Sequence, residues 1–396
     1  MTLPRRFVSG VTWSASRRTS ERRFFLVPGE VVNEIVSFSL AAALEAAPTV
    51  ALHAFVVLST HLHAILTDYS EPNQRSQVDR FFEVLDGMIA RGVNAHLGRG
   101  DHFWCAGSWR GFELHDQAAL ERQLVYVYTN PVKDGLTPTL EEWPGVRFLP
   151  EDFGEVFSYA KPEAAFFGGR RPADFLPTYP PARRERELEL AREAKQAKRA
   201  EVARLVSEEG YTRAQAKAAY REAQAAAAAA AAAAEAAEAA QEAEEVTTAS
   251  FTLQPPPVLG SALAPTLEAA KAHYRALLNL ETAELQARRR SQGKSFLGAE
   301  RVMEQDPFAS SGSTVPSYES IPRAIAGDEE LNKAVQKGFW RWQEAYRSAF
   351  RAWPQEQLEF PSGAHLIVAR HGARTMSPAE AVRAGLIPAT GPPRAA

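Results

Sequence analysis

The residues best suited to chemistry are two histidines, His61 and His63, which open an apolar run that ends at Asp68. The stretch 50–68 consists of two β-branched or aromatic-rich runs joined at Ser59-Thr60, which predicts a β-hairpin. Side chains two residues apart share one face of a strand. His61 and His63 therefore point the same way, and neighbouring imidazoles can bind one metal ion. A His-x-His pair at a strand edge is also often only solvated or hydrogen-bonded, so the pair alone leaves both interpretations open.

A second group of candidate residues lies in the run LVYVYTNPV, residues 124–132. Side chains at i and i+4 stack on one face of a helix, so Tyr126 and Asn130 are expected to face the same way. Tyr128 is turned about 200° from Tyr126 at 3.6 residues per turn. A tyrosine beside an amide is common in proteins, but next to a two-histidine site it would be catalytic.

A small α+β domain is expected to position these residues, with helices packed against an antiparallel sheet. Apolar spacing and proline stops predict helices for 30–47, 77–97 and 116–128, the last ending at Asn130-Pro131 because proline cannot continue a helix. Apart from the hairpin, strands are expected at 7–14 and 109–114.

The remainder of the chain changes character after Trp143-Pro144-Gly145. Residues 151–182 form a connector rich in Pro, Gly and aromatic residues. The segment 183–260 begins with Ala, Glu, Lys and Arg, including ten consecutive alanines at 225–234, and predicts a long exposed helix, with disorder as the rival, then a break around Pro255. Residues 261–396 form a mostly helical C-terminal extension with helices at 266–290 and 329–353 and a final strand at 360–369. The first domain covers residues 1–150.

Composition excludes several classes of protein. At 396 residues and 45% hydrophobic content the chain can bury a sizeable core, and a net charge of −3 excludes a uniformly basic binder. Arginines are nevertheless concentrated before residue 25, where they suit a polyanion or are simply solvated. One cysteine, Cys105, excludes an internal disulfide and a cysteine-based zinc cage. Since no membrane-spanning run or secretory signal is recognised, a cytoplasmic location is expected.

The motifs together resemble the REP-associated tyrosine transposases, which are similar to the insertion-sequence-200 class and belong to the HUH endonuclease group (His, hydrophobic residue, His). The similarity is carried by HAFVVLSTHLH at 53–63, FW at 103–104 and YVYTNPVKDGL at 126–136. It covers residues 5–150 well, and residues 330–374 resemble a longer-tailed branch of the same family.

This resemblance implies a ferredoxin-like domain in which Tyr126 is the nucleophile and His61, His63 and Asn130 bind Mg²⁺ or Mn²⁺. The implied activity is cleavage and rejoining of single-stranded DNA, beside a hairpin, through a 5′-phosphotyrosine. Thr60 departs from the family, which usually has Asn before the first histidine, without removing a ligand. A monomer or a homodimer is expected.

The arginines and aromatic residues of the N-terminal region supply candidate DNA contacts. Arg17, Arg18, Arg22 and Arg23 are expected to pair with phosphates. Trp13 or Trp104 either stacks a base or packs in the core. His102 either assists near the site or is structural.

Other enzyme classes fit less well. A histidine-triad hydrolase would need a third histidine where Ile65 stands, and the Gly293-Lys294-Ser295 run lacks the preceding glycine of a phosphate-binding loop, having Arg288 instead. A zinc site would need cysteines or a suitable third histidine nearby, and the sequence around His61 and His63 provides neither. The alternative function is that of a domesticated protein that binds DNA hairpins and does not cut them.

Overall fold

The computed structural model describes residues 5–70, 76–107, 109–162, 201–208, 211–212, 215–216, 218–220, 248–257, 266–312, 323–352, 359–364 and 374–387. Two compact units divide the chain. The first contains residues 1–167, 248–365 and 373–396, and the second contains residues 168–247 and 366–372.

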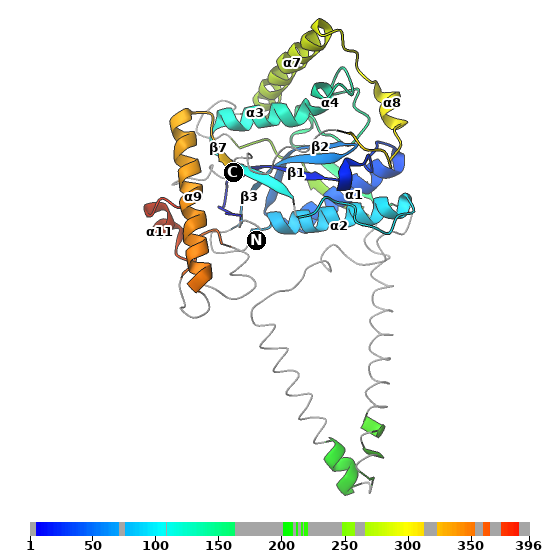
Figure 1. Cartoon of the computed structure of the whole chain (residues 1–396), viewed down its shortest axis with the longest axis vertical. Helices are drawn as coiled ribbons and strands as arrows, with labels where there is room; N and C mark the ends of the chain where they lie inside the picture. The colour runs from blue at the N-terminus through cyan, green and yellow to red at the C-terminus, as the bar shows by residue number, and fades with distance from the viewer. Residues whose placement is uncertain are drawn as a thin grey trace. The chain divides into compact units, whose positions relative to one another are not determined.

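A five-stranded sheet forms the centre of the first unit (Figure 1). Its spatial order is β2-β3-β1-β4-β7, where every neighbouring pair is antiparallel except β4 with β7. The strands are β1 (Thr12–Arg18), β2 (Val50–Leu58), β3 (His61–Asp68), β4 (Arg110–Leu114) and β7 (Ala324–Ile325). The predicted hairpin is confirmed, with Leu58 paired to His61. The α+β class is confirmed as well.

The first strand lies further along the chain than the predicted 7–14. Gly10 adopts a φ of 76°, which favours glycine and interrupts the extended backbone. Phe7 is therefore outside the strand and packs its ring 5.3 Å from that of Trp13. The shift places Arg17 and Arg18 in the strand itself.

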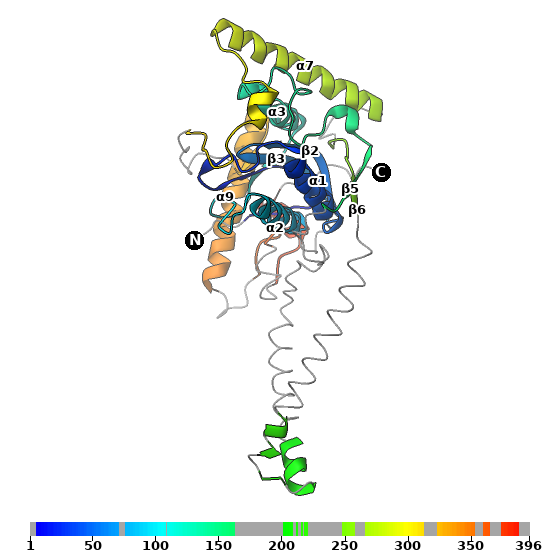
Figure 2. The ribbon, with the colours of Figure 1, turned by 90° about the vertical axis from the view of Figure 1, so that its right-hand side faces the viewer.

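Helices cover both faces of the sheet. Figures 1 and 2 show α1 (Glu30–Glu45) and α2 (Val78–His96) on one side and α3 (Gln117–Tyr128) on the other. The predicted helices 30–47 and 77–97 are confirmed. Helices α1 and α2 pack closely where Gly92 meets Ile35, since a Cβ at Gly92 would lie 2.6 Å from the Ile35 side chain.

The predicted third helix, 116–128, is confirmed, and a further short helix follows it at Asn130-Pro131. Helix α3 ends at Tyr128, and α4 (Asn130–Lys133) follows with Pro131 in its first turn. Proline is tolerated there because the first turn of a helix needs no donor from that position. The backbone continues in a near-helical path, as the hydrogen bond from Thr129 N to Val125 O shows.

The C-terminal part is helical, as predicted. Helix α7 spans Leu267–Ser291, α8 Ala299–Met303, α9 Glu329–Ala352 and α11 Pro378–Arg383. Short 3-10 helices occur at Ser20–Arg22 (η1) and Pro150–Asp152 (η2). These C-terminal elements and the N-terminal sheet belong to one compact unit. None of the described helices combines the length and apolarity needed to cross a membrane.

Two strands occur where only a connector and a break were predicted. Strand β5 (Val156–Ala160) pairs antiparallel with β6 (Thr248–Thr252). Their aromatic side chains pack together: the rings of Phe157 and Phe251 contact each other, and both contact the ring of Phe148. The pairing joins segments far apart in sequence, which local patterns do not reveal.

Within the second unit the structure describes a small part of the alanine-rich segment. Residues 201–208 are helical, and Val202 and Leu205 pack against Ala216. Most of the long helix predicted there lies outside the described residues. The predicted final strand, 360–369, is wrong over its described half, where Phe360 makes one parallel bridge with Thr375 and a turn follows at Ser362-Gly363. Residues 365–369 lie outside the described residues.

Candidate functional site

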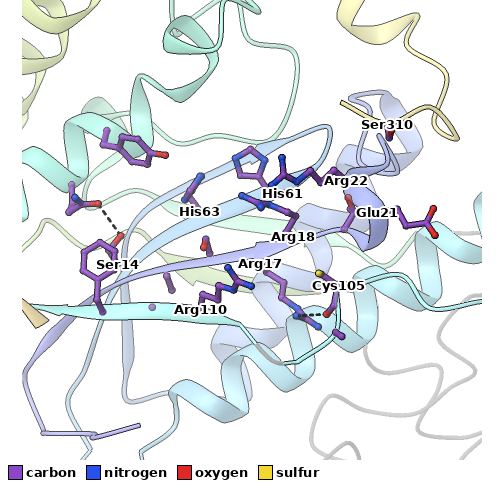
Figure 3. Close-up of a pocket in the computed structure, with 18 of the residues that line it drawn as sticks. Ser14, Arg17, Arg18, Glu21, Arg22, His61, His63, Cys105, Arg110 and Ser310 are labelled. Atoms are coloured by element: carbon purple, nitrogen blue, oxygen red, sulfur yellow. Dashed lines mark hydrogen bonds between the residues drawn. The ribbon is translucent and has the colours of Figure 1, made fainter. Parts of the chain in front are cut away.

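A cleft of about 610 Å³ opens on the face of the sheet that carries α3. Strands β1, β3 and β4, the turn after β1, and helix α3 contribute to its lining. Figure 3 shows His61, Arg18 and Arg22 close together in this cleft. His63 and Tyr126 line the same cleft.

Strand β3 presents both histidines to the cleft, as the two-residue spacing predicts. The ring centres of His61 and His63 lie 4.8 Å apart. Burial lowers the pKa of His61 to about 4, with smaller effects from Arg18 and Arg22. Burial and then His61 hold the pKa of His63 well below its usual value. Both imidazoles are therefore neutral at pH 7, which is the form that binds metal.

Thr60 fixes the ring of His61 from the hairpin turn. The Thr60 hydroxyl lies 2.8 Å from His61 Nδ1. Since Nδ1 is engaged, Nε2 remains the ring nitrogen for a metal ion, in the manner of outer-shell partners that orient histidine ligands. Thr60, a residue at which the chain departs from the motif it resembles, thus contacts a predicted ligand directly.

Tyr126 and Asn130 both approach His63. The rings of His63 and Tyr126 are 5.6 Å apart and nearly perpendicular, and Asn130 Nδ2 lies 3.3 Å from His63 Nε2. Asn130 is buried, whereas Tyr126 is 37% exposed. Tyr128 faces the opposite way, is buried, and donates a hydrogen bond to the His53 carbonyl. The four predicted site residues are therefore brought together, and the two tyrosines are separated as the helical spacing predicts.

The donor set of this site is two imidazoles and one carboxamide. Over the described ranges, no group of three His, Cys, Asp or Glu side chains is arranged to hold a metal ion. The amide of Asn130 contacts His63 through its nitrogen, and rotating the amide by half a turn would present its oxygen instead. This set suits a divalent ion that takes nitrogen and oxygen ligands.

Three of the four predicted arginines, Arg17, Arg18 and Arg22, line the cleft. Arg18 and Arg22 line the cleft, and the pKa of Arg18 is lowered by burial and by the charges of Arg22 and Arg110. Arg17 also lines the cleft, but its Nε lies 2.8 Å from Asp86 Oδ2 and its Nη1 donates to the Cys105 carbonyl. Arg23 forms an ion pair with Glu21 and donates to the Phe308 carbonyl.

Two further cations at the site were missed by sequence reasoning. Arg110 lines the cleft from β4, opposite Ser16 in the register with β1. Lys133 places its ammonium group 4.2 Å from the centre of the Tyr126 ring. Lys133 lies inside the YVYTNPVKDGL motif, seven residues after Tyr126. Seven residues are two turns of a helix, so the spacing could have predicted that Lys133 lies on the same side as Tyr126. No local sequence pattern predicts that Arg110 lies at the cleft, because the pairing of β4 with β1 brings it to that position.

The aromatic residues proposed as base-stacking platforms have structural partners. Trp13 is 2% exposed and packs edge-on against Trp109. Trp104 donates its indole N–H to the Asp86 carbonyl and lies beneath the guanidinium of Arg17. The contacts of Trp13 and Trp104 therefore favour packing within the protein over stacking on a DNA base. His102 is exposed and is not among the residues that line the cleft.

Comparison with known proteins finds a distant structural similarity. No protein-family model matches the chain, and no curated protein matches it. Among solved structures, the chain is similar to a REP-associated tyrosine transposase bound to a REP hairpin, with 21% sequence identity and a TM-score of 0.31. That similarity covers 38% of this chain and 85% of the other chain. A similarity of this size leaves the function to be inferred from the site itself.

Proposed function

We propose that this protein is a metal-dependent endonuclease that cleaves and rejoins single-stranded DNA through a 5′-phosphotyrosine, as a transposase of the HUH type. One observation carries the proposal. An accessible tyrosine, Tyr126, lies beside two neutral imidazoles and a buried carboxamide in a cleft lined with arginines. These groups come from a hairpin and a helix that the sequence motifs identify separately.

The topology supports the ferredoxin-like part of the proposal. The elements follow the order β1-α1-β2-β3-α2-β4, and the four strands lie side by side as β2-β3-β1-β4, all antiparallel. This element order is that of the split βαβ arrangement of ferredoxin-like domains. Helices α1 and α2 cover one face, which leaves the opposite face for the histidines and α3 (Figure 2).

His61, His63 and the carboxamide of Asn130 would hold the metal ion, Mg²⁺ or Mn²⁺. The fit rests on two neutral imidazoles and on an amide 3.3 Å from the Nε2 atom of His63. When bound, the ion would neutralise charge on the scissile phosphate and orient it. Histidine ligands favour Mn²⁺ over Mg²⁺, so Mn²⁺ is the better choice for an assay.

The covalent step assigned to Tyr126 is attack of its phenolic oxygen on the scissile phosphorus. A bond forms between Oη and phosphorus, the phenolic proton is lost to solvent, and the bond from phosphorus to the 3′ oxygen breaks. The leaving oxygen takes a proton and becomes a 3′-hydroxyl. Attack of a 3′-hydroxyl on the phosphotyrosine reverses these steps and joins two DNA ends. No net oxidation or hydrolysis occurs, so the phosphodiester energy is kept.

Arginines at the cleft would bind the DNA backbone beside the scissile phosphate. Arg18, Arg22 and Arg110 line the cleft and suit phosphate oxygens. Arg17 and Arg23 hold protein carbonyls and carboxylates, and we assign them to shaping the cleft.

The test is a search for a covalent adduct. The protein is incubated with Mn²⁺ and single-stranded hairpin DNA labelled at either end, and the adduct is resolved on a denaturing gel. We expect an adduct with the wild-type chain and none with Tyr126→Phe. Tyr128→Phe is the matched control, because Tyr128 is buried with its hydroxyl on the His53 carbonyl, and it should keep adduct formation.

Loss of a predicted ligand separates cutting from binding. His61→Ala should abolish cleavage and leave hairpin binding largely intact, since the arginines remain. An adduct that persists in Tyr126→Phe would move the nucleophile elsewhere, and unaltered cutting by His61→Ala would reject the metal assignment. Hairpin binding by the wild-type chain without any adduct would instead identify the non-cleaving DNA-binding protein.

A further inference from the structure

The turn after β1 has an unusual backbone at the edge of the cleft. Glu21 and Arg22 adopt φ values of 52° and 55°, and both side chains line the cleft. Two successive non-glycine residues in the left-handed region are uncommon. Such conformations persist where the surroundings impose them, and they are concentrated at functional sites. The contacts at this turn come from within the N-terminal region and, through Phe308, Ala309 and Ser311, from a segment after α8.

Residues 305–311, which we call the strap, follow α8 and run along this turn. Phe24 N donates to the Ala309 carbonyl at 3.0 Å, and Ser311 N donates to the Arg22 carbonyl at 3.2 Å. Arg23 and Ser310 form an antiparallel bridge. The ring of Phe308 packs edge-on against Phe25. The strap therefore holds the turn on both sides of Arg23, at the Arg22 carbonyl and at Phe24 N, through main-chain hydrogen bonds.

The strap also reaches the hairpin turn that precedes His61. Ser59 donates a hydrogen bond to Gln305 Oε1 at 2.9 Å. Ser59 and Thr60 in turn accept hydrogen bonds through their carbonyls from Leu26 N and Thr19 N. The strap, the arginine-bearing turn and the hairpin turn are thus joined in one network. Figure 3 shows Ser310 of the strap near the turn that carries Glu21 and Arg22.

We propose that the strap is a positioning element of the active site, which holds Arg22 where it binds a DNA phosphate next to His61. This inference rests on the proposed function for the identity of the ligand. No strap residue is assigned a chemical step. Without the strap the turn would relax to a more common backbone conformation, and Arg22 would move away from the cleft. The C-terminal extension would then be part of the catalytic apparatus.

The first experiment needs no DNA. Ser311→Pro removes the donor to the Arg22 carbonyl, whereas Ser311→Ala keeps it. Amide hydrogen exchange is measured by mass spectrometry in the full-length chains. Residues 19–26 should exchange about fivefold faster in Ser311→Pro, the equivalent of one net hydrogen bond. Helix α1 should be unchanged, and Ser311→Ala should match the wild type. Unchanged exchange of residues 19–26 in Ser311→Pro would overturn the proposal.

A second pair of variants covers the case that the proline prevents folding. Gln305→Leu loses the acceptor for the Ser59 hydroxyl, and Gln305→Glu keeps an acceptor there. Exchange of residues 19–26 should rise in Gln305→Leu and stay near the wild-type value in Gln305→Glu. Equal exchange in these two variants would show that the strap does not hold the turn.

The second experiment measures binding of single-stranded DNA as a function of salt. Each lost phosphate contact lowers the slope of log K against log salt by about 0.7 for single strands. Ser311→Pro and Arg22→Gln should each lose one such contact, and the double variant should lose no more than either alone. Additive losses, or wild-type binding by Ser311→Pro, would refute the positioning role.

These readouts remain separate from the cleavage hypothesis. A wild-type chain that forms no adduct would reject the proposed chemistry and leave both the exchange and the salt slopes interpretable. A wild-type chain without salt-dependent DNA binding would overturn the assignment of Arg22 to phosphate.

Discussion

Thr60 contacts His61, one of the residues proposed to bind the metal ion. Its hydroxyl lies 2.8 Å from His61 Nδ1, and loss of such outer-shell partners typically lowers metal affinity about 10–100-fold. Thr60→Val keeps the shape and removes the hydroxyl, so we expect weaker Mn²⁺ binding of that order by calorimetric titration. Thr60→Ser keeps the hydroxyl and should bind like the wild type. Equal affinity of Thr60→Val and wild type would contradict the role.

A buried histidine away from the cleft should make stability depend on pH. His53 contacts the Gln254 carbonyl and the Thr67 hydroxyl, and burial lowers its pKa from 6.5 to about 4. The unfolded chain binds this proton below pH 6.5, whereas the folded chain does not until about pH 4. Stability is thus complete above pH 6.5 and is lost as the pH falls, by up to about 3 kcal/mol from this residue.

The variant His53→Gln isolates this contribution from those of His61 and His63. Urea unfolding is measured at pH 7.5 and pH 4.5 without metal. The wild type should lose more free energy of unfolding between these two conditions than His53→Gln does. The same loss in both chains would exclude His53 as a source of the pH dependence.

The sequence predicted the site residues whose arrangement depends on spacing within one strand or helix, and it missed those brought to the cleft by pairing between strands. His61 and His63 share a face because strands repeat every two residues, and Tyr126 and Asn130 are one helical turn apart. Arg110 enters the cleft only because β4 pairs with β1. The roles proposed for these residues come from the family resemblance and not from their spacing.

Long, strongly periodic segments were predicted well at the scale of elements. Helices α1, α2, α7 and α9 have clear apolar spacing, and their predicted limits agree with the structure to within a few residues. The two-residue strand β7 and the β5–β6 pair depend on partners distant in the sequence. No local pattern marks such strands, because their hydrogen bonds are all made to other segments.

Helix α9 offers a direct comparison between two tryptophans. Trp342 is fully buried, and its indole N–H donates to the Ser362 carbonyl at 2.8 Å, whereas Trp340 is 59% exposed. Trp342→Ala should lower the free energy of unfolding by about 3–5 kcal/mol through a cavity and an unpaired carbonyl. Trp340→Ala should change it by less than about 0.5 kcal/mol. Similar costs in chemical denaturation would contradict the packing of α9.

The whole first unit is held together by contacts between its ends. Arg6 is buried, forms an ion pair with buried Glu113 on β4, and donates to the Leu386 carbonyl at 2.6 Å. The sequence predicted a domain of residues 1–150 and a helical extension of residues 261–396, and it left open whether helix 329–353 packs on that domain or meets a partner. The described C-terminal elements and the N-terminal sheet lie in one compact unit. Sequence patterns could not show this, because contacts between distant segments decide it.

Breaking the buried pair should be costly. Arg6→Met leaves Glu113 without its main cation in a buried position, so we expect a loss of about 3–5 kcal/mol in the free energy of unfolding. Arg6→Met combined with Glu113→Leu removes both charges and should recover much of that loss. A double variant as unstable as Arg6→Met alone would show that the charge left behind is not the cause.

The margins of the central sheet bear on how copies of the chain meet. At β2, the backbone is paired with other segments of the same chain, as the bonds from Val57 N to Val146 O and from Gln254 N to Leu52 O show. At the other side, β7 is only two residues long. Exposed, long outer strands invite self-assembly by strand addition, and short or occupied ones discourage it. Within the described residues, neither margin of the central sheet therefore favours the addition of a strand from a second copy of the chain.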